Sequence, residues 1–134
     1  MGIALQNKEY CMDMGYGTFF QLRKKIAHLY DEDFGEIYEL WVNGKCDNST
    51  INRKIEELFQ NKTFTDQDNY TLDFLFQSDC EGKISYKDCK RLLEVIGDYD
   101  NNIQYGYVYA NNSFSYFKEM LKDCVTKRRN LYWR

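Results

Sequence analysis

Apolar side chains recur at helical spacing in the first third of the chain. From Phe19 to Tyr30 they fall three and four residues apart, as on one face of a helix. This pattern predicts a helix over residues 18–31, with Thr18 as its N-cap. The cations Arg23-Lys24-Lys25 in the middle of this helix are expected to point mostly outward.

Five more apolar stripes of helical period follow along the chain. The corresponding helices are predicted to begin after the acidic run 31–33, at Ser49 or Thr50, at Thr65, at Ser85 and at Ser113. Thr65 and Ser85 are each followed three residues later by an aspartate, which is a short-acid form of the capping box. The pattern therefore predicts five or six helices, of which the fifth ends at Gly97.

Strand signals are confined to short segments. Apolar and polar residues alternate over Tyr10–Met14, and Leu131–Arg134 suits a terminal strand. The chain shows no shift in composition and no internal repeat, and its longest predicted loop covers residues 98–111. We expect one mainly α domain over residues 1–134, with two or three short strands.

Composition excludes several classes of protein. With 43% hydrophobic residues, 2 Trp, 12 Tyr, 9 Phe and no Pro, the chain is neither disordered nor collagenous. The formal net charge of −3 does not favour direct nucleic-acid binding. No signal peptide or membrane span is apparent. Five cysteines without a C-x-x-C pair indicate reduced thiols, so a cytoplasmic location is expected.

One acidic segment follows the pattern of an EF-hand loop. With Gly82 at loop position 6, the candidate Ca²⁺ ligands at positions 3, 5, 9 and 12 are Asp79, Glu81, Ser85 and Asp88. This reading predicts an EF-hand-like helix–loop–helix over about 65–97. Gln77 at position 1 and the short Asp88 at position 12 weaken two of the strongest ligand positions. The alternative is that the acidic turn only caps the following helix.

The same segment carries a resemblance. Ser78-Asp79-Cys80-Glu81-Gly82, with Ile84 and Cys89 behind it, resembles the motif of a family of small, largely uncharacterised bacterial and phage-borne proteins. The upstream run Gly15-Tyr16-Gly17-Thr18-Phe19-Phe20, with Arg23, is similar to that family's N-terminal segment. Gln77 stands where the family often has His. The resemblance transfers no activity, but it implies a role in conflict between bacterium and phage.

Three tyrosines lie two residues apart in the long loop. Tyr105, Tyr107 and Tyr109 would project to one side of an extended segment, where tyrosine offers rigid amphipathic contact area. Together with Arg23 and Trp133 they are the candidate residues for binding a partner. The alternative is that the tyrosines cover the helical core as a flap.

No catalytic set is visible in the sequence. His28 is the single histidine, and its helical position indicates a surface or boundary residue. The leading hypothesis is a non-enzymatic binding module without a cofactor, which sequesters a partner protein or a nucleotide-like signal. A weak Ca²⁺-responsive module is the alternative. An enzyme with an unrecognised site is a third hypothesis.

Overall fold

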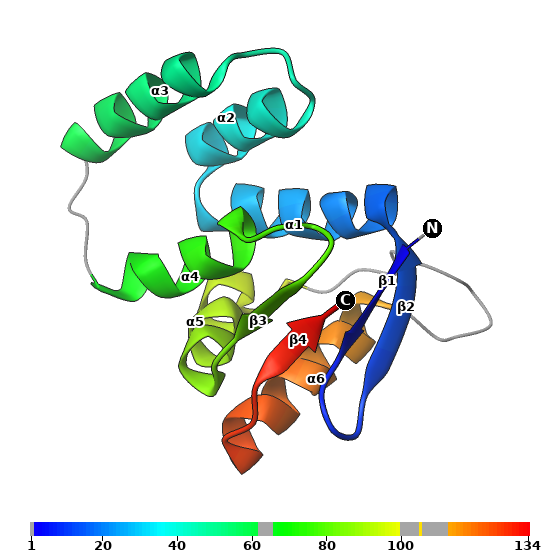
Figure 1. Cartoon of the computed structure of the whole chain (residues 1–134). Helices are drawn as coiled ribbons and strands as arrows, with labels where there is room; N and C mark the ends of the chain where they lie inside the picture. The colour runs from blue at the N-terminus through cyan, green and yellow to red at the C-terminus, as the bar shows by residue number, and fades with distance from the viewer. Residues whose placement is uncertain (1, 62–65, 100–104, 106–112) are drawn as a thin grey trace.

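The computed structural model describes residues 2–61, 66–99, 105 and 113–134 (Figure 1). Within these ranges the mainly α fold is confirmed, with six helices and with four strands rather than two or three. In chain order the elements are β1 Gly2–Gln6, β2 Cys11–Gly15, α1 Tyr16–Tyr30, α2 Glu32–Val42, α3 Asn48–Gln60, α4 Asp66–Phe76, β3 Gly82–Ile84, α5 Tyr86–Ile96, α6 Phe114–Lys127 and β4 Leu131–Trp133.

The four strands form one antiparallel sheet in the order β2-β1-β4-β3. Leu5 on β1 lies opposite both Met12 and Trp133, and Ile84 lies opposite Leu131. All five side chains are buried, because alternate residues of a strand point to the same face. This face joins a hydrophobic core supplied by α1, α4, α5 and α6.

The two ends of the chain meet in the middle of the sheet. β1 and β4 are neighbours, and the Ala4 amide donates to the Arg134 carbonyl at 3.0 Å. Figure 1 shows both labelled ends at this sheet. The strand β1 was not anticipated, because its five residues carry little periodic signal.

The helix caps correct two details of the predicted boundaries. Helix α1 begins at Tyr16 after Gly15, which makes no side-chain cap bond, so Thr18 is not the N-cap. Helix α3 is capped by Asp47, whose carboxylate accepts from the Thr50 amide at 2.7 Å, rather than by Ser49 or Thr50.

Two of the predicted caps are confirmed. Ser85 and Asp88 form a reciprocal capping box at the start of α5. Ser113 accepts from the Tyr116 amide at 3.2 Å at the start of α6. Helix α5 ends at Gly97, whose φ of 56° is a conformation that glycine adopts without strain. The predicted cap Thr65 lies outside the described residues.

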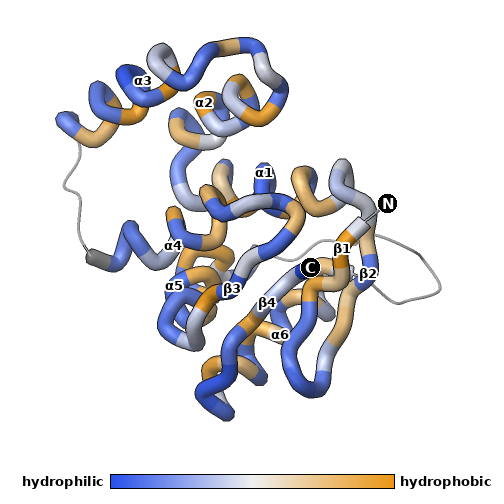
Figure 2. Tube along the Cα trace, in the orientation of Figure 1, coloured by the Kyte–Doolittle hydropathy of each residue, from blue (hydrophilic) through white to orange (hydrophobic). Residues whose placement is uncertain are grey.

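Helices α2 and α3 extend away from the sheet. α2 packs against α1, and α3 packs against α2 (Figure 1). The hydropathy colouring in Figure 2 shows apolar and polar positions alternating along both helices. Ile51 is the one fully buried residue of α3. The contact of α1 with α2 places side chains of both helices around a common cavity, described below.

Candidate functional site

Arg23 lies inside the molecule, although the sequence predicted that it points outward. Its side chain is only 5% exposed, because Arg23 falls on the buried stripe of α1 between Phe19 and Ile26. The guanidinium lies 4.3 Å from the ring centre of Phe19 and 5.2 Å from that of Trp133. Aromatic rings at these distances stabilise a desolvated cation.

The guanidinium is incompletely paired. Arg23 Nη2 donates to the Ser78 carbonyl at 3.5 Å, which also accepts from Trp133 Nε1 at 2.9 Å. Within the described part of the chain, Arg23 Nε has no hydrogen-bond partner and no carboxylate forms a salt bridge with this guanidinium. A buried cation in this state is costly, because it has lost water without gaining a full set of acceptors.

Burial also shifts the acid–base equilibria around Arg23. Desolvation lowers the pKa of Arg23, and the Tyr38 hydroxyl and the Asp79 carboxylate oppose this effect. The Tyr38 hydroxyl donates to the Leu75 carbonyl at 3.1 Å. Its burial raises the pKa of Tyr38 to about 12, against an opposing effect of Arg23. Tyr38 is therefore a neutral hydroxyl at physiological pH.

A cavity of about 460 Å³ opens over this guanidinium, and we call it the Arg23 pocket. Its walls come from α1, α2, the end of α4 and the turn that follows α4. They are formed by Tyr16, Phe19, Phe20, Arg23, Tyr38, Trp41, Val42, Phe76, Gln77, Ser78 and Asp79. Val42 and Phe76 are 40% and 38% exposed, the two large apolar side chains most open to solvent among those described. The pocket thus combines a buried cation with apolar walls.

Trp133 supports this pocket from below instead of presenting a free surface. Its side chain is 1% exposed, so a partner cannot reach the indole ring, although the sequence placed Trp133 among the candidate binding residues. A Cβ built on Gly82 would collide with the Trp133 indole. Gly82 belongs to strand β3, and it is not among the described glycines with positive φ. The glycine is therefore needed to make room for the indole.

The four candidate Ca²⁺ ligands do not converge. Asp79 and Glu81 are exposed, and Ser85 and Asp88 are engaged in the capping box of α5. The side-chain amide of Gln77 spans the loop: Oε1 accepts from the Lys83 amide at 2.9 Å and Nε2 donates to the Lys83 carbonyl at 2.8 Å. With Gly82 at loop position 6, Lys83 is at position 7, and in an EF-hand the backbone carbonyl at position 7 ligates the ion. The described residues contain no group of three potential metal ligands.

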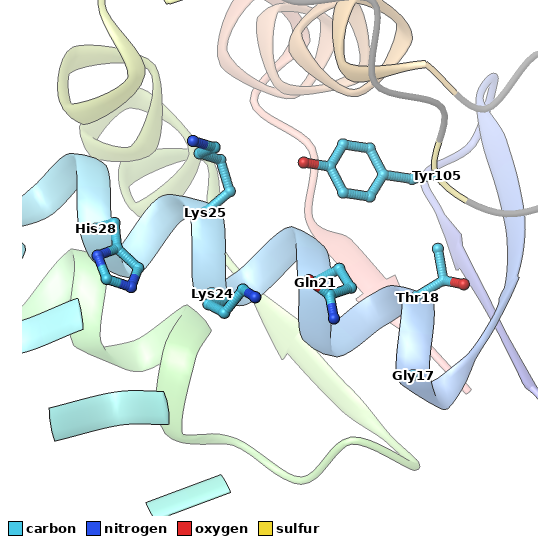
Figure 3. Close-up of a pocket in the computed structure, with 7 residues that line it drawn as sticks. All are labelled: Gly17, Thr18, Gln21, Lys24, Lys25, His28 and Tyr105. Carbon is cyan, nitrogen blue, oxygen red and sulfur yellow. The ribbon is translucent and has the colours of Figure 1, made fainter. Parts of the chain in front are cut away.

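A second cavity, of about 670 Å³, runs along the other side of α1 (Figure 3). Figure 3 shows its lining residues Gly17, Thr18, Gln21, Lys24, Lys25, His28 and Tyr105. Its basic side chains already have neighbours: Lys24 and His28 each lie 3.3 Å from Glu39, and Lys25 lies 4.8 Å from the ring centre of Tyr99. This cavity is the weaker candidate for a binding site.

Tyr105 lines the second cavity but is itself buried. It is 2% exposed and packs against Phe114, with ring centres 6.0 Å apart. Burial raises the pKa of Tyr105 to about 12. This packing agrees with the alternative interpretation of the tyrosines as a cover for the core. Tyr107 and Tyr109 lie outside the described residues, so a role of these two in partner binding stays a prediction.

Sequence reasoning placed Arg23 among the binding candidates and Asp79 among the candidate Ca²⁺ ligands, but it missed the rest of the pocket lining. Tyr38, Trp41 and Phe76 were assigned to core stripes because helical spacing does not distinguish a core wall from a pocket wall. One signal was available in the sequence. Arg23 occurs four residues after Phe19 and three before Ile26, on the apolar stripe itself.

Among the described residues, no helix has both the length and the apolar character required to cross a bilayer. Comparing the chain with models of known protein families, with curated proteins and with solved structures gave no match.

Proposed function

We propose that this protein is a non-enzymatic binding module and that the Arg23 pocket is its binding site. The observation that carries the proposal is the guanidinium of Arg23, which belongs to a side chain that lines the cavity and whose buried Nε lacks a hydrogen-bond partner among the described residues. A ligand that offers an acceptor would complete the pairing of Arg23. It would also cover the exposed apolar side chains Val42 and Phe76.

The size of the pocket supports a small ligand or one side chain of a partner. A volume of about 460 Å³ falls within the range of about 300–1,000 Å³ that is usual for ligand sites. Aromatic walls and one charged group also match the usual composition of such sites, in which few polar groups orient a mostly apolar ligand. The two ligand classes proposed from the sequence are a partner protein and a nucleotide-like small molecule.

A role in conflict between bacterium and phage is part of the proposal. Its support is the resemblance of two segments to a phage-borne family, the run from Gly15 to Arg23 and the run from Ser78 to Gly82. Both segments contribute to the walls of the Arg23 pocket, although they lie more than fifty residues apart in the chain. Six residues that carry the resemblance therefore also line the proposed binding site, namely Tyr16, Phe19, Phe20, Arg23, Ser78 and Asp79.

Ligand-dependent thermal melting tests the proposal. The panel contains AMP, GMP, and cyclic mono- and dinucleotides, because a ligand that binds only the native state raises the melting temperature. Arg23→Lys should abolish any shift, since an ammonium cannot present the planar fork of Arg23. Arg53→Lys makes the same change at an exposed position of α3 and should leave the shift intact. If a ligand raises the melting temperature of both variants equally, it binds at a site other than the Arg23 pocket.

A weak Ca²⁺-responsive module is the second candidate. It is favoured by the exposed carboxylates of Asp79 and Glu81, which stand two residues apart next to a helix–loop–helix turn. Melting in EDTA and in millimolar Ca²⁺ tests it. The double variant Asp79→Asn with Glu81→Gln should remove a Ca²⁺-dependent rise, and the absence of any rise in the unmodified protein excludes this candidate.

A further inference from the structure

We infer that the Arg23 pocket selects a carboxylate attached to an aromatic or similarly planar apolar group, in preference to a phosphate. This inference rests on the proposed function and specifies the ligand class of the same site. It follows from the charge balance of the pocket, from the edge by which its guanidinium can be approached, and from the rings that form its walls.

The charge balance favours a single negative charge on the ligand. Arg23 and Asp79 are the only charged residues among the described residues that line the pocket, so the lining is neutral overall. A phosphate monoester carries close to two negative charges at neutral pH, and the Asp79 carboxylate would repel the second. A carboxylate carries one charge, which the Arg23 guanidinium can balance.

The surroundings of Arg23 limit how a ligand can reach it. The Phe19 ring lies 4.3 Å away against the guanidinium, which leaves the edge of the planar group for polar contacts. Nη2 is directed to the Ser78 carbonyl only at the long distance of 3.5 Å, and Nε is buried without an acceptor among the described residues. A planar carboxylate matches such an edge with two parallel hydrogen bonds.

The walls of the pocket favour an aromatic group next to that carboxylate. Trp41 and Phe76 have ring centres 5.4 Å apart with their planes inclined by 59°, and Phe76 is 38% exposed. A third ring can pack edge to face against such a pair. Val42, at the end of α2, adds an exposed apolar side chain to the same walls. Binding would remove this apolar surface from water.

This chemistry can come from a free aromatic acid or from the carboxyl terminus of a peptide that ends in an aromatic residue. Two matched pairs of probes separate these sources. The first pair is N-acetylphenylalanine and its amide, and the second is an acetylated Gly-Gly-Phe peptide with a free or an amidated carboxyl terminus. Phenyl phosphate is the phosphate probe. Binding of the peptide acid more tightly than the free acid would assign the site to a protein partner.

The reporter is the Nε–H signal of Arg23 in ¹⁵N-labelled protein, since this group has no acceptor among the described residues. We expect each acid to shift this signal downfield and to bind at least tenfold more tightly than its amide. Phenyl phosphate should bind more weakly than N-acetylphenylalanine. Val42→Asp should weaken both acids at least threefold by adding a like charge to the pocket, and this exposed position allows the variant to fold. Asn52→Asp, exposed on α3, is the charge-matched control.

Two outcomes would overturn the inference in different ways. If phenyl phosphate or a nucleotide binds more tightly than the acids and also moves the Arg23 signal, the preference for a carboxylate is rejected. The proposed function then still stands. Equal binding of an acid and its amide would also reject this preference and leave the proposed function standing. No movement of the Arg23 signal with any acid, phosphate or nucleotide would reject the inference and the proposed function together.

Discussion

At the scale of single residues, two glycines in neighbouring helices have opposite surroundings. Gly35 on α2 faces His28 on α1, and a Cβ at Gly35 would come within 2.8 Å of the His28 Cα. Gly17 on α1 is exposed, and a Cβ there would meet nothing within 4 Å. Neither glycine has a positive φ. The same substitution should therefore change stability in opposite directions at the two sites.

We expect Gly35→Ala to lower the free energy of unfolding by about 1–3 kcal/mol, because overpacking forces the backbones of α1 and α2 apart. Gly17→Ala should raise it by roughly 0.5–1 kcal/mol through the helix propensity of alanine. Urea denaturation of both variants and the unmodified protein measures these changes. Stabilisation by Gly35→Ala would contradict the close approach of the two helices.

Asp88 gives the stability of the protein a predictable dependence on pH. Burial raises the pKa of Asp88 from 3.8 to about 6, with a further contribution from the Asp73 carboxyl and against the hydrogen bonds from Ser85. The folded state therefore binds this proton more tightly than the unfolded state does. The resulting stabilisation is complete below about pH 3.8 and is lost as the pH rises through about 6.

Asp88→Asn should remove this pH dependence, because the asparagine amide keeps an acceptor for the Ser85 amide and carries no charge. Relative to Asp88→Asn, the unmodified protein should lose unfolding free energy between pH 4 and pH 7. Denaturation midpoints measured across this range check the prediction. Asp73→Asn is the second variant, and it should reduce the loss because it removes the neighbouring carboxyl. Parallel pH profiles for all three proteins would show that Asp88 titrates normally.

Individual residues also show where sequence reasoning ends. The caps Ser85 and Ser113 were predicted, because a cap depends on residues within one turn of itself. The burial of Arg23 was not, because it depends on Phe74 and Trp133, which lie far along the chain. The proposed binding site was therefore only partly visible in the sequence.

At the scale of elements, the turn between α4 and α5 is held by a side chain in place of an ion. Gln77 bonds to both the amide and the carbonyl of Lys83. An ion would compete with the Gln77 amide for the Lys83 carbonyl if the loop closed as an EF-hand does. The helix–loop–helix order was predicted correctly from periodicity. The EF-hand-like loop itself is not confirmed, since Gly82 lies in a strand and lacks a positive φ.

Restoring the two weakened ligand positions should therefore create or strengthen a Ca²⁺ response. We expect the double variant Gln77→Asp with Asp88→Glu to bind Ca²⁺ more tightly than the unmodified protein, because it supplies carboxylates at loop positions 1 and 12. Isothermal titration calorimetry with Ca²⁺ measures the gain. Gln77→Ala is the control and should weaken the turn without adding a ligand. A double variant that binds no better than this control would reject the loop alignment.

At the scale of the whole molecule, the sheet depends on its last strand. β4 lies between β1 and β3 and carries Trp133, which is buried beneath the Arg23 pocket. Sequence patterns predicted a strand near the end of the chain but not its central place, because strand order depends on pairing between distant segments. Removing β4 would separate the β1–β2 hairpin from β3.

Deletion of residues 131–134 should abolish cooperative thermal unfolding, since loss of a buried tryptophan alone typically costs about 3–5 kcal/mol. Deletion of Arg134 alone removes the hydrogen bonds with Ala4 and the contact of the Arg134 guanidinium with the Tyr132 ring, and it should preserve cooperative unfolding at a lower midpoint. Calorimetry of the two truncated proteins checks both expectations. A cooperative transition in the longer deletion would mean that the helices fold without the sheet.

The pairing of β1 with β4 also bears on how the protein is made. The hairpin of β1 and β2 leaves the ribosome before β4, the neighbour that covers its open edge, which is translated more than a hundred residues later. During that interval the unpaired edge of β1 can pair with another nascent chain. Joining the two ends through a short linker and opening the chain between α2 and α3 would make this contact local, which should speed folding and suppress aggregation on synthesis.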